Sequence, residues 1–487
     1  MSTENNAMLE SILQEFLHLA EIPRPSHHEE KVSAYLMRWA AEHGLSFEQD
    51  RLGEVIIDKP ASPGCEEVPR VILQAHMDMV CVAAEGTSFD PLKDPIQVLN
   101  DGKTLTAKGT SLGADDGIGV ALCLHILKDT SLRHGPVRAI FTVNEEDGMS
   151  SIDLPEQYLD AGYLINLDWE WLGSLCNSSA GCDFFTLARR PSWEALSPGS
   201  RAVQIRLKGL LGGHSGVDIN RGRANALISL AAALSELRKS GIPFQLLDFH
   251  GGQARNAIPS SADAAIAAAE CDVPEILDRL KAAEASWRGC FEGVEEHAVF
   301  IVEPGKTVEG QALCQADTDA LLSLLLSVPC GVHTISPFVP SLTESSQNLG
   351  LLSMSADAIT LECMERSCTA YRAEELLRTS RLVAESFGFS FSRGDHAPAW
   401  AVNPHSRLTP LTCRLYQELT GREMVVEPVH GGLECGAFFE KNPALDMIAI
   451  GPSLRDVHTP KESCDLESVA VTAKLITAVL EQISLMA

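Results

Sequence analysis

The stretch Val71-Ile-Leu-Gln-Ala-His-Met-Asp78 joins an apolar run to a histidine and a carboxylate. A short, continuous apolar run predicts a buried strand. Because side chains two residues apart in a strand point the same way, His76 and Asp78 face one side. The imidazole of such a pair can bind a metal while the carboxylate orients it. Taken alone, the stretch favours a simpler interpretation, in which two polar residues cap a buried strand.

A second acidic site lies in the Gly-rich stretch Ser111-Leu-Gly-Ala-Asp-Asp-Gly-Ile-Gly119, ahead of a helix-like segment over 118–128. Acids at a helix start often serve only as favourable first-turn charges. A phosphate-binding loop is excluded, because Asp115 and Asp116 would repel a phosphate and the Gly-x-Gly-x-x-Gly spacing is absent. One of these carboxylates can instead bridge two cations, and either acid fits that part.

A third acidic site follows the strand-like run that begins at Arg138 and ends in Asn144-Glu-Glu-Asp-Gly148. Adjacent residues at a strand end point in opposite directions. One of Glu145 and Glu146 can therefore bind a metal while the other faces a metal-bound water as a general base. The alternative is a solvated acidic turn in an acid-rich protein.

Two further candidates complete the set. Asp168 follows the run Tyr163-Leu-Ile-Asn-Leu167, and His458 lies in Asp456-Val-His-Thr-Pro460. Two imidazoles and three carboxylates suffice for two zinc ions if one carboxylate is shared.

The order His-x-Asp, Gly-Ala-Asp-Asp, Asn-Glu-Glu-Asp-Gly, Leu-Asp and His-Thr-Pro resembles the co-catalytic di-zinc exopeptidases of the aminoacylase, carnosinase and dipeptidase group. The similarity extends from Ile22-Pro-Arg-Pro-Ser26 to the His-Thr-Pro segment. It implies two Zn²⁺ ions per subunit, for which Co²⁺ or Mn²⁺ can substitute. The implied roles are these: His76 and Asp168 hold one zinc, Glu146 and His458 hold the other, Asp115 bridges them, Asp78 orients His76, and Glu145 is the general base.

The resemblance also implies hydrolysis of dipeptides, including Xaa-His dipeptides such as β-Ala-His. A water held by the zinc ions would lose a proton to Glu145 and attack the peptide carbonyl, and Glu145 would return the proton to the leaving amine. His214 would stabilise the oxyanion, while Asn256 and Arg366 would bind the substrate backbone and carboxylate. From the residues alone, a Gly-rich turn, a turn before Pro259 and a surface ion pair explain the same three positions.

Two other functions remain open. A related aminoacylase or tripeptidase would use the same metal chemistry. A non-catalytic peptide- or metal-binding homologue is the second alternative, and the intact Glu145 argues against it.

The spacing of the ligands predicts the domain organisation. Four ligands lie between residues 76 and 168 and the fifth at 458, in a chain of 487 residues with 45% hydrophobic content. A chain of this length usually forms more than one domain. We therefore expect a catalytic domain in two parts, 1–183 and 398–487, around an inserted lid or dimerisation domain, 184–397.

The outer parts alternate strands and helices, which predicts an α/β three-layer sandwich with a mostly parallel sheet and the metals at its strand ends. The insert is predicted to be α+β, with a β-α-β-β-α-β, ferredoxin-like order. Its expected segments are 202–207, 224–237, 244–249, 262–268, 274–286 and 297–302. Helical patterns at 317–326 and 374–387, with strand-like segments between them, indicate that the insert can hold two related halves.

Composition limits the partners. A net charge of −28, from 38 basic and 66 acidic residues, argues against nucleic-acid binding. By sequence, no apolar stretch approaches the roughly 20 residues needed to cross a bilayer, and the N-terminus lacks signal-peptide features. We therefore expect a cytoplasmic protein that acts on small peptides without a membrane.

The fourteen cysteines are dispersed and predict reduced core residues, with Cys435 a packed, inert thiol. The family resemblance implies a homodimer assembled through the insert. A doubled insert that shields the site within one chain is the alternative.

Overall fold

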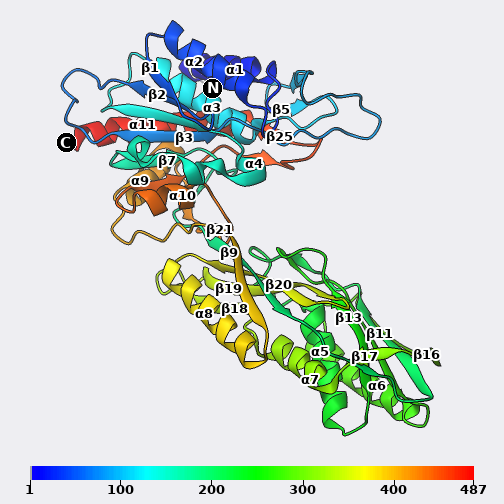
Figure 1. Cartoon of the computed structure of the whole chain (residues 1–487). Coiled ribbons are helices and arrows are strands. Elements are labelled where there is room, and N and C mark those ends of the chain that lie inside the picture. The colour runs from blue at the N-terminus through cyan, green and yellow to red at the C-terminus, as the bar shows by residue number, and fades with distance from the viewer. Residues whose placement is uncertain (1–2, 487) are drawn as a thin grey trace. The chain divides into compact units, whose positions relative to one another are not determined.

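The computed structural model describes residues 3–486 and contains two compact units. Unit 1 comprises Met1–Ser179, Pro398–Val429 and Leu433–Ala487, and unit 2 comprises Ala180–Ala397 and His430–Gly432. The border that the sequence analysis placed after residue 183 lies inside strand β9 (Gly181–Arg189). Figure 1 shows the elements of both units.

A six-stranded sheet forms the centre of unit 1, in the order β1-β2-β6-β3-β7-β23. The four strands β6, β3, β7 and β23 are parallel, β2 pairs antiparallel with β6, and β1 pairs antiparallel with β2. Buried residues fill β3 and β6 from end to end, as expected for parallel strands covered on both faces. The strand bounds are β1 Ser46–Gln49, β2 Val55–Lys59, β3 Val71–His76, β6 Val137–Thr142, β7 Tyr163–Asn166 and β23 Asp446–Ala449.

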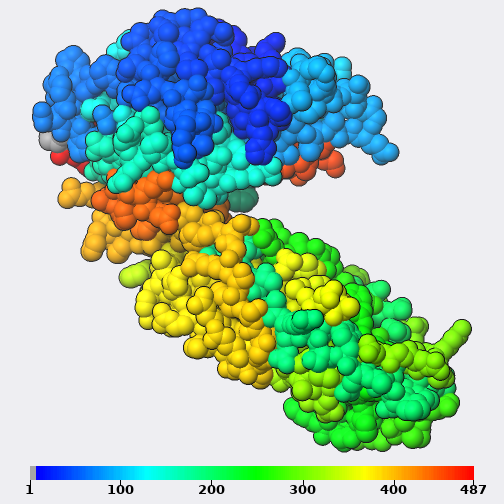
Figure 2. All heavy atoms as spheres, viewed as in Figure 1, coloured from blue at the N-terminus to red at the C-terminus, as the bar shows by residue number. Residues whose placement is uncertain are grey.

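Alternation along these strands fills a separate core on each face of the sheet. Val71 and Leu73 belong to one core, whereas Ile72 belongs to the other. Helices α1, α2, α3, α9 and α11 contribute to the first core, and α10 contributes to the second. Their bounds are α1 Thr3–Ala20, α2 Glu30–Glu42, α3 Ala114–Lys128, α9 Leu408–Thr420, α10 Cys435–Lys441 and α11 Leu466–Leu485. The predicted three-layer α/β sandwich is confirmed. In Figure 2 the N-terminal residues of unit 1, in blue, form a continuous part of its surface.

Helix α11 corrects one expectation from the sequence. Over Leu466–Leu485 it is long and apolar enough to cross a membrane by length and composition, with a mean hydropathy of 1.4. Its apolar side chains instead pack against α1, α3 and α9 in the first core, where Val469, Ile476 and Val479 are fully buried. A core helix covered on most sides has the same composition as a membrane span.

Short elements complete unit 1. The strands β4 (Val98–Asn100), β5 (Thr104–Ala107), β24 (Leu454–Arg455) and β25 (Ser463–Asp465) form a small antiparallel sheet. The others are α4 Glu145–Gly148, η1 Ser150–Asp153, η2 Glu156–Leu159, β8 Ser174–Leu175 and β22 Val425–Val426.

The first half of unit 2 has the predicted β-α-β-β-α-β order. Its four strands form an antiparallel sheet in the order β16-β11-β15-β13, which is the ferredoxin-like arrangement. The elements are β11 Ser200–Lys208, α5 Ala226–Lys239, β13 Gln245–Gly251, β15 Ala262–Ala269, α6 Val273–Cys290 and β16 Val299–Thr307.

The second half of unit 2 repeats this topology around the first. Its strands follow the order β19-β20-β9-β21, which matches the first half if β9 is its first strand. The first half is therefore inserted between β9 and the rest of the second half. Its other elements are α7 Gln315–Ser327, β19 Thr343–Met354, β20 Ile359–Ser367, α8 Ala370–Ser386 and β21 Ser390–Ala397.

A pairing between Gly251 and Leu352 joins the two halves into one eleven-stranded sheet. The two predicted halves are thus confirmed, but the second begins with β9, ahead of the first half, rather than after it. The remaining short strands of unit 2 are β10 Trp193–Ala195, β12 Gly213–His214, β14 Ala257–Ile258, β17 Gln311–Leu313 and β18 Gly331–Ile335.

Candidate metal centre

The parallel strands of unit 1 bring three of the predicted ligand segments to one edge of the sheet. His76 is the last residue of β3, Asp168 follows the end of β7, and Glu146 lies in α4, which follows β6. Since β6, β3 and β7 are parallel neighbours, their carboxyl ends lie side by side. Ligand sites of open α/β sheets are commonly found at this edge.

Asp115 lies between the two candidate histidines. Its Oδ1 is 3.0 Å from Nε2 of His76, and its Oδ2 is 3.0 Å from Nε2 of His458. His458 comes from the loop between β24 and β25, and its Nε2 is also 2.9 Å from Oε2 of Glu146. Nε2 of His76 is 3.8 Å from Oδ1 of Asp168. Each imidazole thus faces Asp115 and one further carboxylate.

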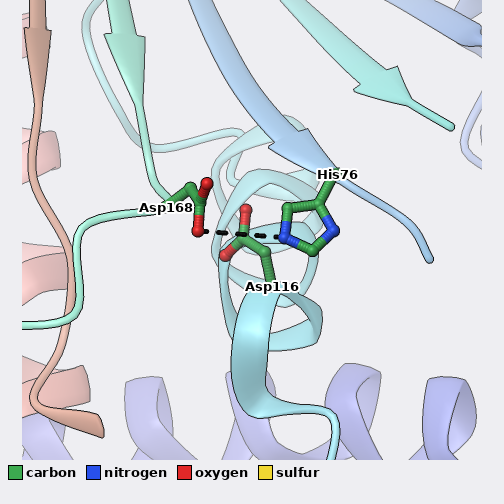
Figure 3. Close-up of side chains that lie close together, drawn as sticks. All are labelled: His76, Asp116 and Asp168. Atoms are coloured by element: carbon green, nitrogen blue, oxygen red, sulfur yellow. Dashed lines mark ion pairs between the residues drawn. The ribbon is translucent and has the colours of Figure 1, made fainter. Parts of the chain in front are cut away.

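Asp116 is fully buried next to the same group. Figure 3 shows its side chain close to those of His76 and Asp168, and the ligand atoms of these three residues lie within 4.8 Å of one another. Oδ1 of Asp116 accepts a hydrogen bond from the backbone N–H of Gly119 at 3.1 Å. Asp116 therefore caps the first turn of α3 with one oxygen, whereas both oxygens of Asp115 face imidazoles.

Asp78 contacts both His76 and the acidic turn. Its Oδ1 is 3.4 Å from Nδ1 of His76. The same carboxylate accepts hydrogen bonds from the backbone N–H groups of Glu145 at 3.1 Å and Glu146 at 3.2 Å. Burial opposes ionisation of Asp78, but the contact with His76 and these hydrogen bonds lower its pKa to about 2. Asp78 thus fixes a histidine and the turn that bears two glutamates.

The charge balance of this edge fits bound cations. Burial, reinforced by Asp115 and Asp116, raises the pKa of Asp168 well above its usual value, against the effect of His76. Oε1 of Glu146 and Oδ2 of Asp116 are buried and accept no hydrogen bond from any residue in the described range. Imidazole nitrogen and carboxylate oxygen are common ligands of zinc. The residues present therefore fit divalent metal ions.

Two buried residues that the sequence analysis did not single out hold the ligand-bearing loops. The carboxylate of Glu462 accepts hydrogen bonds from four successive backbone N–H groups, Leu112 to Asp115, at 2.7 to 3.3 Å. Arg24 donates to the carbonyls of Met77, Asp78 and Gly113 at 2.6 to 2.9 Å. Their sequence positions gave a weak signal, because Glu462 follows His458 by four residues and Arg24 lies in the Ile-Pro-Arg-Pro stretch.

The candidate substrate residues lie in unit 2, where His214 and Arg366 are in contact. Nη2 of Arg366 is 3.2 Å from Nε2 of His214, and its Nε donates to the hydroxyl of Ser215 at 3.3 Å. Burial and the Arg366 charge lower the pKa of His214. Arg366 is 6% exposed, and its polar side-chain contacts within residues 3–486 are to Ser215 and His214. The surface-ion-pair interpretation of Arg366 is therefore wrong.

Asn256 lies beside this pair with an exposed side chain. Its carbonyl accepts a hydrogen bond from Ser215 N–H at 2.9 Å, and the next residue, Ala257, pairs with His214 across β12 and β14. A further histidine, His430, shares a 2.7 Å hydrogen bond with the hydroxyl of Ser346, the register partner of Arg366. His430 was not among the predicted substrate residues.

Cys435 is a fully buried free thiol, and burial raises its pKa well above the usual value. The predicted inert thiol is confirmed, because a reactive cysteine needs an accessible thiolate.

Comparisons with known proteins agree with this geometry. The chain is 34% identical over 469 residues to the cytosol non-specific dipeptidase of Escherichia coli (strain K12), covering 96% of each chain. The crystal structure of aminoacylhistidine dipeptidase from Vibrio alginolyticus matches with a TM-score of 0.92 and 32% identity, over 97% of this chain and 96% of that one. The aminopeptidase PepT from Bacillus cereus, at 16% identity and a TM-score of 0.56, shares the fold.

The family predicted from the order of the motifs is confirmed by a match over residues 72–482, which contains all five predicted ligands. With that match, the chain belongs to peptidase family M20/M25/M40.

Proposed function

We propose that this protein is a dipeptidase that uses two zinc ions to hydrolyse dipeptides, including Xaa-His dipeptides such as β-Ala-His. The observation that carries the proposal is the position of Asp115, whose two oxygens each face a different imidazole at 3.0 Å. The substrate class is supported by the names of the two relatives, a non-specific dipeptidase and an aminoacylhistidine dipeptidase.

In the proposed arrangement His76 and Asp168 would hold one zinc, Glu146 and His458 would hold the other, and Asp115 would be shared between them. The distances between side chains support this division, because each imidazole approaches Asp115 and the carboxylate assigned to the same ion. Asp115 is preferred over Asp116 as the bridge because one oxygen of Asp116 is engaged by Gly119 N–H. Co²⁺ or Mn²⁺ can replace zinc at such a donor set.

When bound, the two metals supply Lewis acidity and a reactive water for attack on the peptide carbonyl. Glu145 acts as the general base and later donates the proton to the leaving amine. Its placement supports this role, since Asp78 holds the backbone N–H groups of both Glu145 and its neighbour Glu146. Asp78 also orients the imidazole of His76 through Nδ1.

Unit 2 supplies the groups that recognise the substrate. Arg366 binds the terminal carboxylate, since a buried guanidinium is suited to a substrate anion. His214 stabilises the oxyanion, and the lowered pKa keeps its imidazole neutral, as a donor of one hydrogen bond. The exposed side chain of Asn256 binds the peptide backbone.

We also propose that the protein is cytoplasmic and forms a homodimer through unit 2. The cytosolic location named for the Escherichia coli relative supports the first part. For the second, β18 at the side of the large sheet exposes Val332 and Ile335, at 39% and 49%. Exposed apolar side chains on an edge strand are typical of interfaces. Light scattering should give a dimer, and Ile335→Asp should give a monomer.

The test of the proposed activity is the release of amino acids from a substrate panel. β-Ala-His, Gly-His, Ala-His and Leu-Gly are compared with Gly-Gly-His and N-acetyl amino acids, before and after chelation and again after zinc addition. Chelator-sensitive cleavage of the dipeptides alone is expected, and the ratio between Gly-His and Leu-Gly shows whether histidine matters. Cleavage of Gly-Gly-His or the acetylated amino acids instead would assign a tripeptidase or an aminoacylase. No turnover by the zinc-loaded protein would favour a binding protein.

A further inference from the structure

Glu434 places a buried carboxylate next to the strands that carry two of the candidate ligands. It precedes α10 in the stretch His430-Gly-Gly-Leu-Glu-Cys-Gly436, and its side chain is 0% exposed. Oε2 of Glu434 accepts a hydrogen bond from Nε2 of Gln74 at 2.6 Å and one from the hydroxyl of Thr142 at 2.8 Å. Neither the ligand set nor the proposed chemistry uses this carboxylate.

Glu434, Gln74, Thr142 and Asn166 form a buried polar layer. Two of its residues, Gln74 and Asn166, each precede a candidate ligand by two positions in the chain. Gln74 precedes His76 by two residues in β3, and Asn166, at the end of β7, precedes Asp168 by two residues. Gln74 and Asn166 are register partners on these neighbouring strands. Side chains two residues apart in a strand lie on the same face. Nδ2 of Asn166 donates to Oε1 of Gln74 at 2.6 Å, and Oδ1 of Asn166 accepts from the backbone N–H of Asp168 at 3.3 Å.

The Glu434 carboxylate determines which group of each amide in this layer donates and which accepts. Oε2 of Glu434 is the acceptor of both hydrogen bonds, so Gln74 must present its NH₂ group to Glu434. The carbonyl oxygen of Gln74 then faces Asn166, which must present its own NH₂ group. The oxygen of Asn166 is thereby left for the N–H of Asp168. Gln74, Thr142, Asn166 and Glu434 are all fully buried, so water cannot replace a lost partner without entering the core.

We propose that Glu434 is a positioning residue, which fixes this buried layer and so sets the metal affinity at the position between His76 and Asp168. The inference rests on the proposed function, because it concerns one of the two zinc positions assigned above. Residues that hold metal ligands in place typically change metal affinity or activity by about 10–100-fold when they are replaced.

Two substitutions separate hydrogen bonding from bulk. Glu434→Gln keeps an oxygen that can accept from Gln74 and Thr142, and its amide can face the buried hydroxyl of Ser151, which has no other hydrogen-bond partner in the described range. Glu434→Met fills a similar volume but removes the acceptor that Gln74 and Thr142 share, and leaves Gln74 Nε2 only its 3.2 Å hydrogen bond to the Thr142 hydroxyl. Gln74 is then free to flip, which reverses the direction of the layer.

The experiment measures both metal dissociation constants by competition with a chromogenic chelator, and the visible spectrum of the Co²⁺-loaded protein. Glu434→Met should weaken one of the two metals by about 10–100-fold and change the Co²⁺ spectrum. Glu434→Gln should stay within a few-fold of the unmutated protein, and Thr142→Val should show a smaller loss in the same direction. A Glu434→Met protein that binds two metals with unchanged affinity and spectrum would overturn the proposal. So would a Glu434→Gln protein as impaired as Glu434→Met.

Asp446 provides the matched control. It is a buried carboxylate in β23 of the same sheet, and its Oδ2 accepts from the N–H groups of Arg407 and Leu408 at 2.7 and 3.0 Å. Asp446→Leu should lower the unfolding midpoint without changing the Co²⁺ spectrum. If Glu434→Met does not fold, Thr142→Val serves as the test instead. An unchanged metal affinity in Thr142→Val would then overturn the proposal. An unmutated protein that holds no metal or cleaves no dipeptide would reject the proposed function itself.

Discussion

Histidine side chains have pKa values shifted in opposite directions in the two units. In unit 1 the hydrogen bonds to Asp115 and Glu146 raise the pKa of His458 to about 10. In unit 2 burial, together with the Arg366 charge, lowers the pKa of His430 to about 3. The first environment is rich in carboxylates and attracts cations, whereas the second gathers Arg366 with two neutral histidines and suits an anion. The charge of the surroundings, rather than the residue type, thus decides what each cluster can bind.

The sharpest test of this contrast is removal of the proposed bridge. Asp115→Ala takes away the carboxylate whose two oxygens face the two imidazoles, so we expect loss of both metals and of nearly all activity. Metal content per chain and kcat measured together check this. Asp101→Ala, an exposed acid in the same unit, serves as control. Two retained metals in Asp115→Ala would remove the basis for a shared carboxylate.

Replacement of Glu145 should separate metal binding from catalysis within unit 1. Glu145→Gln keeps the ligand Glu146 and its backbone contact to Asp78, so metal content should stay at the unmutated level. We expect kcat to fall by about 10²–10⁴-fold, the usual contribution of a general base. A kcat within a few-fold of the unmutated enzyme would show that another group takes the proton.

The anion-binding character of unit 2 is tested at Arg366. Because a hydrogen bond to a charged group contributes about 1.5–3 kcal/mol, Arg366→Ala should raise KM for free dipeptides by about 10–150-fold, with a smaller change in kcat. A dipeptide with an amidated C-terminus lacks the anion and should be equally poor for both proteins. If the unmutated enzyme cleaved amidated and free dipeptides alike, Arg366 would not recognise the carboxylate.

The smallest effect is expected for the pH dependence of stability through His430. Its folded pKa lies below the unfolded value of 6.5, so the unfolded chain binds the proton more tightly between about pH 3 and 6.5. Stability is therefore lost as the pH falls through this window, by at most about 1.4 kcal/mol per pH unit. His430→Asn, which keeps a polar group near Ser346, should show a smaller decrease in unfolding midpoint between pH 7 and pH 5. An identical decrease in both proteins would place the sensitivity elsewhere.

The ligand set was accessible from sequence because it follows simple rules. His76 and Asp168 lie at the ends of apolar strands, and parallel neighbours must bring those ends together. Strand alternation and the order of elements likewise predicted the sandwich and the first ferredoxin-like half. The metal-ligand and substrate roles stay predictions, whereas the family and the fold are confirmed.

Other features could not be predicted because they depend on pairing between distant segments. Arg24, Glu462 and Glu434 bind backbone groups or buried amides far away in the chain, and the local sequence does not identify those partners. The second half of unit 2 was assigned a wrong start for the same reason. Its first strand, β9, precedes the first half, so sequence order hides its relation to β19, β20 and β21.

The nested arrangement of unit 2 has a consequence for synthesis on the ribosome. Phe185 of β9 pairs with Cys363 of β20, so the strand leaves the ribosome long before its neighbours exist. At a synthesis rate of roughly 5–20 residues per second, β9 is made on the order of ten seconds before the strands it pairs with. The inner half is contiguous and can complete its own sheet during this delay. We expect the nascent chain to expose β9 as an unpaired strand until β20 has been synthesised.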